Sequence, residues 1–302
     1  MRATIQLCTY NRAALLERVL DACFEQTVPD GTYDVVLVND GSTDSTAAVI
    51  ARARRRATCP FEVIDQPNAG LASARNAGVA KARGERLIFI DDDVLVLPNF
   101  VEEHLRSHAR HPSFIVRGGA INVESFDDLP VAAWSIKDYS SNYFWTTNVS
   151  VPAAALRAVG GFNEGFSEYG WEDIDVGLRL RFAGVRATFN PRALVYHYKP
   201  RLRGSEVEGM VRQARAQART AVQLAGLHPH WRTALATGEY AAARALHAGI
   251  RRAGVPERCR RMVRGLAPDA ALTDAQLRAA RRLARETYFE ELERARRSAG
   301  RS

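Results

Sequence analysis

Long apolar runs are missing from this chain of 302 residues. No segment has the roughly 18 consecutive apolar residues of a membrane-spanning helix. The first residues also lack the charged and then apolar pattern of a secretory signal peptide, since Ala3 to Thr9 has the composition of a core strand. We therefore expect a soluble, cytoplasmic protein. With 46% hydrophobic residues, the chain can bury a core large enough for one big domain, or for a domain with an appendage.

Cysteine and lysine are also scarce. The four cysteines are not spaced like metal ligands, so we interpret them as reduced thiols. Lysine occurs only three times, and the net charge of +8 therefore comes from arginine.

That charge is unevenly distributed. Residues 1–200 carry 21 basic and 24 acidic residues, whereas residues 201–302 carry 21 arginines and 10 acidic residues. A basic surface favours anionic partners such as lipid headgroups or nucleic acid, but the solvated face of a helical appendage gives the same excess of arginine. We expect the helical appendage, with peripheral membrane contact as the alternative, and we expect no nucleic-acid partner.

Strand and helix patterns alternate along the first hundred residues, which predicts an α/β fold with a mostly parallel sheet. The predicted strands are Ala3 to Thr9, Tyr33 to Asn39, Phe61 to Asp65 and Arg86 to Ile90. The predicted helices between them begin near Ala13, after Ser42 to Asp44, and at Leu71, and another opens at Pro98. Further along we expect strands at Phe114 to Val116, Thr146 to Val151, Val185 to Phe189 and Leu194 to Tyr196, and helices from Pro152 and over Trp171 to Phe182.

After Arg201 the composition changes to alanine and arginine with a wholly helical pattern, so we place a domain boundary between residues 200 and 201. Thr273 and Gln276 have the spacing of a capping box for a last helix that reaches about Arg297. One apolar stripe is expected to pack on the first domain or on a second subunit, in a homo-oligomer formed through these helices: Val207, Met210, Val211, Ala214, Ala218 and Val222.

Polar residues follow three of the predicted strands. The first strand ends in Thr9-Tyr10-Asn11-Arg12, the second in Asn39-Asp40-Gly41-Ser42, and the fourth in Asp91-Asp92-Asp93. Parallel strands end at one edge of a sheet, where open α/β sheets bind their ligands. Clustered carboxylates fit a divalent cation with oxygen ligands, and Asp40, Arg12 and Arg75 could bind the base, ribose and phosphates of a nucleotide. A solvated acidic turn and a helix cap would explain each motif taken alone.

The ordered set of motifs resembles the nucleotide-sugar half of family 2 glycosyltransferases with the GT-A fold. The resemblance rests on the three strand ends, on Asn68-Ala69-Gly70-Leu71-Ala72-Ser73-Ala74-Arg75-Asn76, on Gly161-Phe162-Asn163-Glu164 and on Gly170-Trp171-Glu172-Asp173. It covers residues 3–200 and implies a nucleotide-sugar half at 1–97 and an acceptor half at 98–200, followed by the helical region at 201–302.

The resemblance also implies roles for individual residues. The donor would be bound by Thr9, Tyr10, Asn11, Arg12, Asp40, Arg75, Asp91 and Asp92. Asp93 would hold the metal, with His197 completing its coordination, and an imidazole beside carboxylates favours Mn²⁺ over Mg²⁺. Without the resemblance, His197 is an ordinary structural histidine.

Glu172 and Asp173 open the predicted helix of the acceptor half, where Ile174, Leu178 and Phe182 are spaced to anchor one face. Acidic residues are ordinary in a first helical turn. The resemblance implies that Asp173 is the general base of an inverting transfer, and that Trp171 and Glu172 bind the acceptor, which is a glycan, a lipid-linked sugar or a small molecule. The segment Glu124 to Asn142 is the expected specificity loop.

Together these features predict a metal-dependent inverting glycosyltransferase of the hexosyltransferase kind with a nucleotide-sugar donor, most simply a UDP-sugar. A nicotinamide-dependent oxidoreductase is excluded because no G-x-G-x-x-G follows the first strand. A sugar nucleotidyltransferase would need a glycine-rich basic loop where Thr9 to Arg12 stands. A protein that binds nucleotide sugars or glycans without catalysis remains the alternative.

Overall fold

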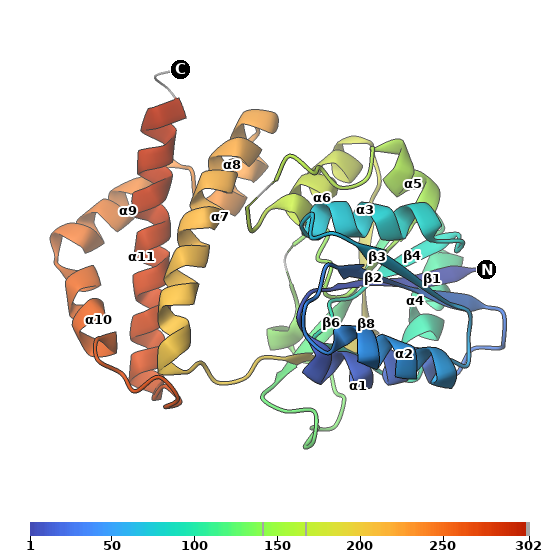
Figure 1. Ribbon diagram of the computed structural model, residues 1–302. Helices are drawn as coiled ribbons and strands as arrows, with labels where there is room; N and C mark the ends of the chain where they lie inside the picture. The colour runs from blue at the N-terminus through green and yellow to red at the C-terminus, as the bar shows by residue number, and fades with distance from the viewer. Residues whose placement is uncertain (141, 167, 300–302) are drawn as a thin grey trace. The chain divides into compact units, whose positions relative to one another are not determined.

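A computed structural model describes residues 1–140, 142–166 and 168–299 of the chain (Figure 1). The chain divides into two compact units, one of Met1–Gly165 and Glu172–Pro200, the other of Phe166–Trp171 and Arg201–Ser302. The short segment Phe166–Trp171 therefore belongs with the helices that follow residue 200, although nothing in its composition predicts this.

The first unit begins with regularly alternating strands and helices. They are β1 (Ala3–Thr9), α1 (Ala13–Phe24), β2 (Tyr33–Asp40), α2 (Thr46–Arg56), β3 (Phe61–Gln66), α3 (Leu71–Lys81) and β4 (Arg86–Phe89). All pairings among these four strands are parallel. Helices α1 and α2 cover one face of the sheet and α3 the other (Figure 1), which explains why the strands are apolar on both faces. The predicted α/β arrangement with a parallel sheet is confirmed in this half of the unit.

The rest of the first unit contains β5 (Val94–Val96), α4 (Phe100–Arg110), β6 (Ile115–Val123), a 3₁₀ turn (Ile136–Asp138), β7 (Val149–Pro152), α5 (Ala153–Ala158), α6 (Glu172–Phe182) and β8 (Ala187–Tyr198). The eight strands form one sheet in the order β3-β2-β1-β4-β7-β6-β8-β5, in which β7 runs antiparallel to β4 and β6. Strand β5 was not predicted, because three residues carry too little pattern. The two strands predicted around Asn190-Pro191 are one strand, with a register shift where it faces Arg117 and Gly119.

The apolar face predicted for α6 is wrong in part. Val176 and Leu180 are fully buried, whereas Phe182 is 51% exposed. Val176 and Leu180 share a core cluster with Phe89, Phe144 and Phe162, whose rings meet edge to face. The packing of α6 therefore uses Leu178, as predicted, together with Val176 and Leu180, and Asp173 stands on the first turn of a firmly anchored helix.

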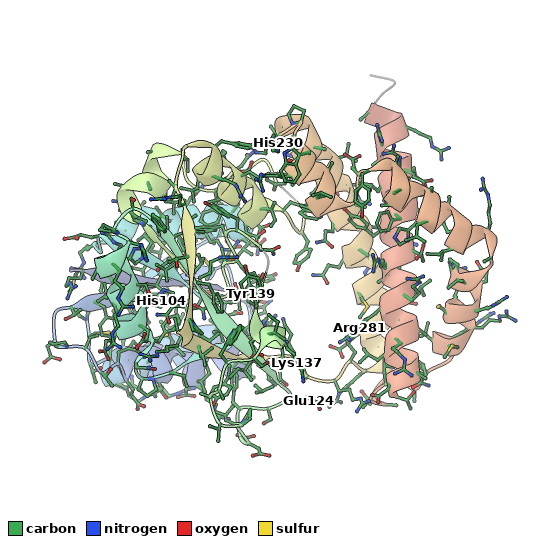
Figure 2. The ribbon with its side chains drawn as sticks, turned by 180° about the vertical axis from the view of Figure 1, so that it is seen from behind. His104, Glu124, Lys137, Tyr139, His230 and Arg281 are labelled. Atoms are coloured by element: carbon green, nitrogen blue, oxygen red, sulfur yellow. The ribbon has the colours of Figure 1, made fainter. Side chains whose placement is uncertain are left out.

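Two histidines of α4, His104 and His108, are buried in the first unit (Figure 2 labels His104). Asn148 donates its amide hydrogens to the carbonyl oxygens of Gly119 and Ala193, so its Oδ1 accepts from Nε2 of His104 at 3.1 Å. Ser150 Oγ lies 2.8 Å from His104 Nδ1 and 2.8 Å from His108 Nε2. Neutral imidazoles satisfy this chain of bonds. Burial lowers the pKa of His104 to about 4 and that of His108 to about 3.

We expect these histidines to destabilise the fold in mild acid. The unfolded chain takes up a proton on each histidine near pH 6.5, whereas the folded chain does not until much lower pH, so stability falls as the pH is lowered through this window. Between pH 7 and pH 5 the wild type should lose about 2 kcal/mol more of its unfolding free energy than His108→Gln loses. Urea unfolding at both pH values measures it, and a constant difference would show that His108 is not buried in its neutral form.

The second unit is helical and contains α7 (Val207–Leu227), α8 (Trp231–Thr237), α9 (Ala241–Arg252), α10 (Val255–Val263) and α11 (Asp274–Ala299), after a 3₁₀ turn at Gly204–Glu206. The predicted capping box is present, since Thr273 N donates to Gln276 Oε1 at 2.9 Å and Gln276 N donates to Thr273 Oγ1 at 3.3 Å. Within the described ranges, none of the helices has both the length and the apolarity to cross a membrane.

The apolar stripe of α7 is covered inside this unit. Val207 and Met210 pack with Leu272 and Ala280, and Ala218 packs with Phe289. The stripe therefore needs no other domain or second subunit to cover it, because Leu272 and α11 supply the partner surface, and a homo-oligomer through these helices stays a prediction.

Candidate functional site

The polar strand ends do meet at one edge of the sheet. One ligand atom from each of Asp91, Asp93 and His197 lies within 4.8 Å of the others. The register of β5 with β8, which pairs Val94 with His197, brings the histidine to the end of β4. The predicted metal pair Asp93 and His197 is therefore close in space, with His197 Nε2 3.4 Å from Asp93 Oδ1.

The donor set of this cluster fits a divalent cation. Asp93 Oδ1 and His197 Nδ1 are buried without a hydrogen-bond partner among the described residues, and buried polar atoms normally have one. Burial raises the pKa of the Asp93 carboxyl, but the nearby charges of His197, Lys199 and Arg12 outweigh it and hold that pKa below its ordinary value. The carboxylate is thus ionised, as a metal ligand must be.

Asp92, the middle acid of the three, belongs to a different set of contacts. It accepts a hydrogen bond from Thr9 Oγ1 at 2.7 Å, and Arg12 Nε lies 3.9 Å from its other oxygen. Burial raises its pKa to about 6 against the opposing effect of Arg12. Asp92 therefore joins the end of β4 to the end of β1, and the structure does not group it with the candidate metal ligands.

Arg75 lies at the centre of a second group of acids. Its guanidinium is only 5% exposed and donates to Glu172 Oε1 at 2.8 Å and to Thr146 Oγ1 at 2.6 Å, while Asp91 Oδ1 lies 3.5 Å away. Asp91 also accepts from Thr147 Oγ1 at 2.6 Å. Desolvation opposes the charge of Arg75, but Glu172 and Asp91 outweigh it and raise its pKa. This network connects the end of β4 to the first turn of α6.

Asp173 is half-buried beside this network. Its Oδ1 accepts from the backbone N–H of Ile174 at 2.7 Å. Burial, with the nearby charge of Glu172, raises the pKa of the Asp173 carboxyl to about 7, although Arg75 acts in the opposite direction. A carboxylate with a pKa near neutrality can accept a proton at physiological pH, which is the property that a general base needs.

The loop after β2 is folded tightly around Asp40. Its Oδ1 accepts from Gln66 Nε2 at 2.7 Å and from Ala69 N at 2.9 Å, and its Oδ2 accepts from Gly70 N at 3.0 Å. Gly41 has a φ of 77°, and a Cβ there would lie 2.5 Å from Asn68 N, so only glycine fits. Asp40 therefore shapes the wall formed by Asn68 to Gly70.

The loop after β1 is fixed by Asn11, which has a φ of 54°. Its Oδ1 accepts from Thr43 N at 2.7 Å, and its own N–H donates to Ser42 Oγ at 3.0 Å. Thr9 is buried and Tyr10 is exposed, so the four predicted residues of this strand end have different environments.

Three residues of the site were not predicted: Thr146, Thr147 and Lys199. The threonines precede β7, and an antiparallel strand places its start at the edge where its parallel neighbours end. The two threonines could have been predicted as site residues only if this antiparallel pairing of β7 had been recognised. Lys199 directly follows β8, the strand that contains His197, and its Nζ lies 3.9 Å from Asp93 Oδ2.

The segment predicted to set specificity is mostly exposed, and a few of its aromatic rings hold it to the sheet. Phe126 is buried against Tyr198, and both Trp134 and Tyr139 pack on Phe189 of β8. Ser141, in the same predicted segment, lies outside the described residues.

Known proteins resemble part of this chain. A validoxylamine A glucosyltransferase of Streptomyces hygroscopicus subsp. jinggangensis is 31% identical over 221 residues, which cover 61% of this chain and 52% of that protein. Chondroitin synthase of Pasteurella multocida is 36% identical over 187 residues, 60% of this chain and 19% of that protein. The chain thus spans about half the length of the first relative and less of the second.

Two solved structures share the fold. The mannosyltransferase PcManGT from Pyrobaculum calidifontis, in complex with GDP-Man and Mn²⁺, has a TM-score of 0.61 at 19% identity and covers 97% of this chain and 85% of its own. S. aureus TarS 1-349 in complex with UDP has a TM-score of 0.58 at 17% identity, over 99% of this chain and 92% of its own.

Two protein families match the sequence itself. Residues 131–201 match the family described as the N-terminal domain of galactosyltransferase. The family described as glycosyl transferase family 2 matches residues 4–161, more than half of the 302 residues. The chain therefore belongs to glycosyl transferase family 2.

Proposed function

We propose that the protein transfers a hexosyl group, with inversion and with a divalent cation, from a nucleotide-diphosphate sugar to an acceptor hydroxyl. The observation that carries this proposal is the single network from the Asp91, Asp93 and His197 cluster through Arg75 to Glu172 and Asp173. The network supports the proposal because it links the candidate cation cluster at the end of β4 to the first turn of α6, which carries a carboxylate of near-neutral pKa.

Asp173 accepts the proton of the acceptor hydroxyl as the hydroxyl oxygen attacks the anomeric carbon and the bond to the diphosphate breaks. Attack from the face opposite the leaving group inverts the anomeric configuration. Glu172, held by Arg75, orients the acceptor side of the site. Such positioned proton transfer contributes about 10² to 10⁴-fold in rate.

Asp93 and His197 would hold the cation, with Asp91 beside them. A bound divalent cation neutralises charge that develops on the leaving diphosphate. The donor would lie along the strand ends, against Thr9 to Arg12, Asp40, Arg75, Asp91 and Asp92. Arg75 is already paired with two acids, so its part is to fix Asp91 and Glu172 as much as to attract phosphate.

UDP-glucose is the donor to test first. Structures of the same fold have bound UDP and GDP-Man, and one relative is named as a glucosyltransferase. Mn²⁺ is the first cation to test, because the candidate ligands combine carboxylates with an imidazole.

We expect UDP-glucose with Mn²⁺ to raise the melting temperature, since a ligand at about 100 times its Kd adds about 2.7 kcal/mol of stability. Slow release of UDP should follow, and EDTA should abolish both effects. A panel that includes GDP-mannose tests the base. Stabilisation without turnover in the presence of acceptors would instead favour a nucleotide-sugar-binding protein, and no response to any donor would contradict the proposal.

A further inference from the structure

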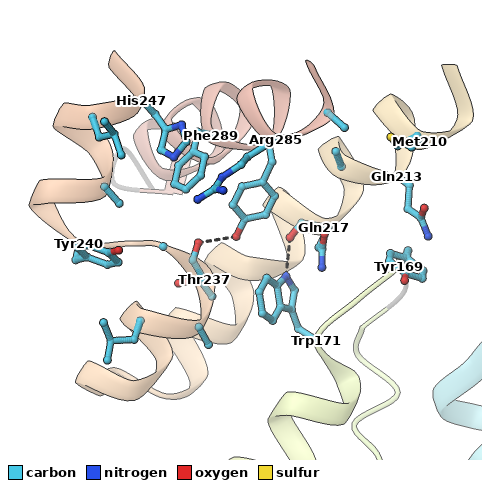
Figure 3. A pocket seen from close by; sticks show the side chains of 18 of the residues that line it. Tyr169, Trp171, Met210, Gln213, Gln217, Thr237, Tyr240, His247, Arg285 and Phe289 are labelled. Atoms are coloured by element: carbon cyan, nitrogen blue, oxygen red, sulfur yellow. Dashed lines mark hydrogen bonds between the residues drawn. The ribbon is translucent and has the colours of Figure 1, made fainter. Parts of the chain in front are cut away.

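The helical unit contains a cavity of about 610 Å³ that none of the sequence motifs explains (Figure 3). It lies among α7, α8, α9 and α11, and the segment Tyr169 to Trp171 closes one side of it. This volume is in the range of sites that hold one sugar-sized or drug-sized molecule.

Five aromatic side chains line the cavity. They are Tyr169, Trp171, Tyr240, Tyr288 and Phe289. Trp171 Nε1 donates to the carbonyl oxygen of Gln217 at 2.7 Å, and Tyr288 Oη donates to that of Thr237 at 2.7 Å, as the dashed lines in Figure 3 show. These bonds fix the polar ends of the two rings, so their faces are held in place for contact with a ligand.

The rim of the cavity exposes more apolar surface than folding requires. Tyr240 is 42% exposed, and Leu235 and Leu246 are each close to 60% exposed. Clustered apolar exposure of this kind marks a binding surface more often than a solvated one.

Three polar side chains line the same cavity without partners. Gln213, Gln217 and Arg285 make no side-chain hydrogen bond or ion pair with any residue that the structure describes, whereas Arg282, on the same helix, contacts Glu286. Arg285 extends from α11 toward the cavity beside Phe289 (Figure 3). The lining therefore combines aromatic faces with amide and guanidinium groups that can donate hydrogen bonds to a ligand.

We infer that this cavity binds a pyranose or cyclitol ring of the acceptor. Such a ring presents C–H groups on its faces and hydroxyl groups around its edge, which matches aromatic walls with hydrogen-bonding side chains between them. A purely apolar ligand would make no use of these groups, whereas the amides of Gln213 and Gln217 and the guanidinium of Arg285 can bond to ring hydroxyls. The inference rests on the proposed function, because Trp171 directly precedes Glu172 and the proposed base Asp173 in the chain.

Ligand-observed NMR with methyl β-D-glucopyranoside and with myo-inositol, on the full chain, tests the inference. We expect saturation transfer to both probes in the wild type and at least tenfold weaker binding in Tyr240→Ala, Arg285→Ala and Gln213→Ala. The control variant Arg281→Ala removes an exposed arginine of the same helix that does not line the cavity, and it should bind as the wild type does. Because Gln213 is exposed, Gln213→Ala should fold normally, so weaker binding in that variant would not be caused by misfolding.

The melting-temperature rise with UDP-glucose and Mn²⁺ separates the two proposals. If the donor stabilises the wild type but neither ring probe binds, the cavity assignment is wrong while the proposed transferase stands. Ring binding that all three cavity variants retain would also overturn the assignment. Binding of decanoate in place of the rings would identify a lipid-chain cavity and overturn it as well. If no donor binds, the proposed function fails, whatever the ring probes show.

Discussion

Asp173→Asn should lower the turnover number by about 10² to 10⁴-fold while leaving donor binding intact. The amide keeps the shape of the carboxyl and can still accept from the backbone N–H of Ile174, but it cannot take the acceptor proton. Initial rates of UDP release with a saturating acceptor measure the turnover number, and the Mn²⁺-dependent rise in melting temperature measures donor binding. Near wild-type turnover in this variant would exclude Asp173 as the base.

The pH dependence of the reaction gives an independent check on Asp173. Its pKa is raised to about 7, and only the ionised carboxylate accepts a proton, so the rate of the wild type should rise with pH through about 7. The sign for stability is the opposite: a carboxyl with a raised folded pKa stabilises the fold at acid pH, and this contribution is lost as the pH rises through 7. Asp173→Asn should therefore be no less stable than the wild type at pH 8. The surface variant Asp30→Asn should change neither the rate nor its pH profile.

Much of the first unit could be predicted from sequence because its strands are apolar on both faces and its turns are polar. The residues after β1, β2 and β4 meet as expected, since parallel strands end together. The pattern was weakest where the sheet becomes antiparallel. There β5 is too short to recognise, and Thr146 and Thr147 enter the site through the direction of β7, which the sequence does not encode locally.

Side-chain pairing was also beyond the sequence. Arg75 lies in a motif that suggests phosphate binding, yet its guanidinium is buried between Glu172 and Asp91, and only the tertiary packing decides this. Asp91, Asp92 and Asp93 are adjacent in sequence, but they point to three sets of partners. The α7 stripe shows the same limit, because its apolar pattern predicts burial but does not say which surface covers it.

The separation of those three aspartates leads to the second large effect. Asp93→Ala should weaken Mn²⁺ binding by at least about 100-fold and remove Mn²⁺-dependent donor binding, because charge neutralisation at the diphosphate is worth several kcal/mol. Mn²⁺ binding can be followed directly by the loss of the free-ion signal in electron paramagnetic resonance, and donor binding by the melting temperature with UDP-glucose. Without the ion the variant should remain folded. Asp93 does attract His197, Arg12 and Lys199, but the last two are about half exposed, and such pairs contribute little to stability.

Asp92→Asn is the matched control for this prediction, one position away on the same turn. Its carboxyl bonds to Thr9 and faces Arg12, and an amide oxygen can accept from both. We therefore expect Asp92→Asn to keep Mn²⁺ affinity within a few-fold of the wild type. Equal loss in the two variants would mean that the cation binds to the acidic turn as a whole, and unchanged affinity in Asp93→Ala would remove this residue from the metal site. A large effect confined to Asp93 is the result that the geometry requires, because its Oδ1, like Nδ1 of His197, is buried without a hydrogen-bond partner in the part of the chain that the structure describes.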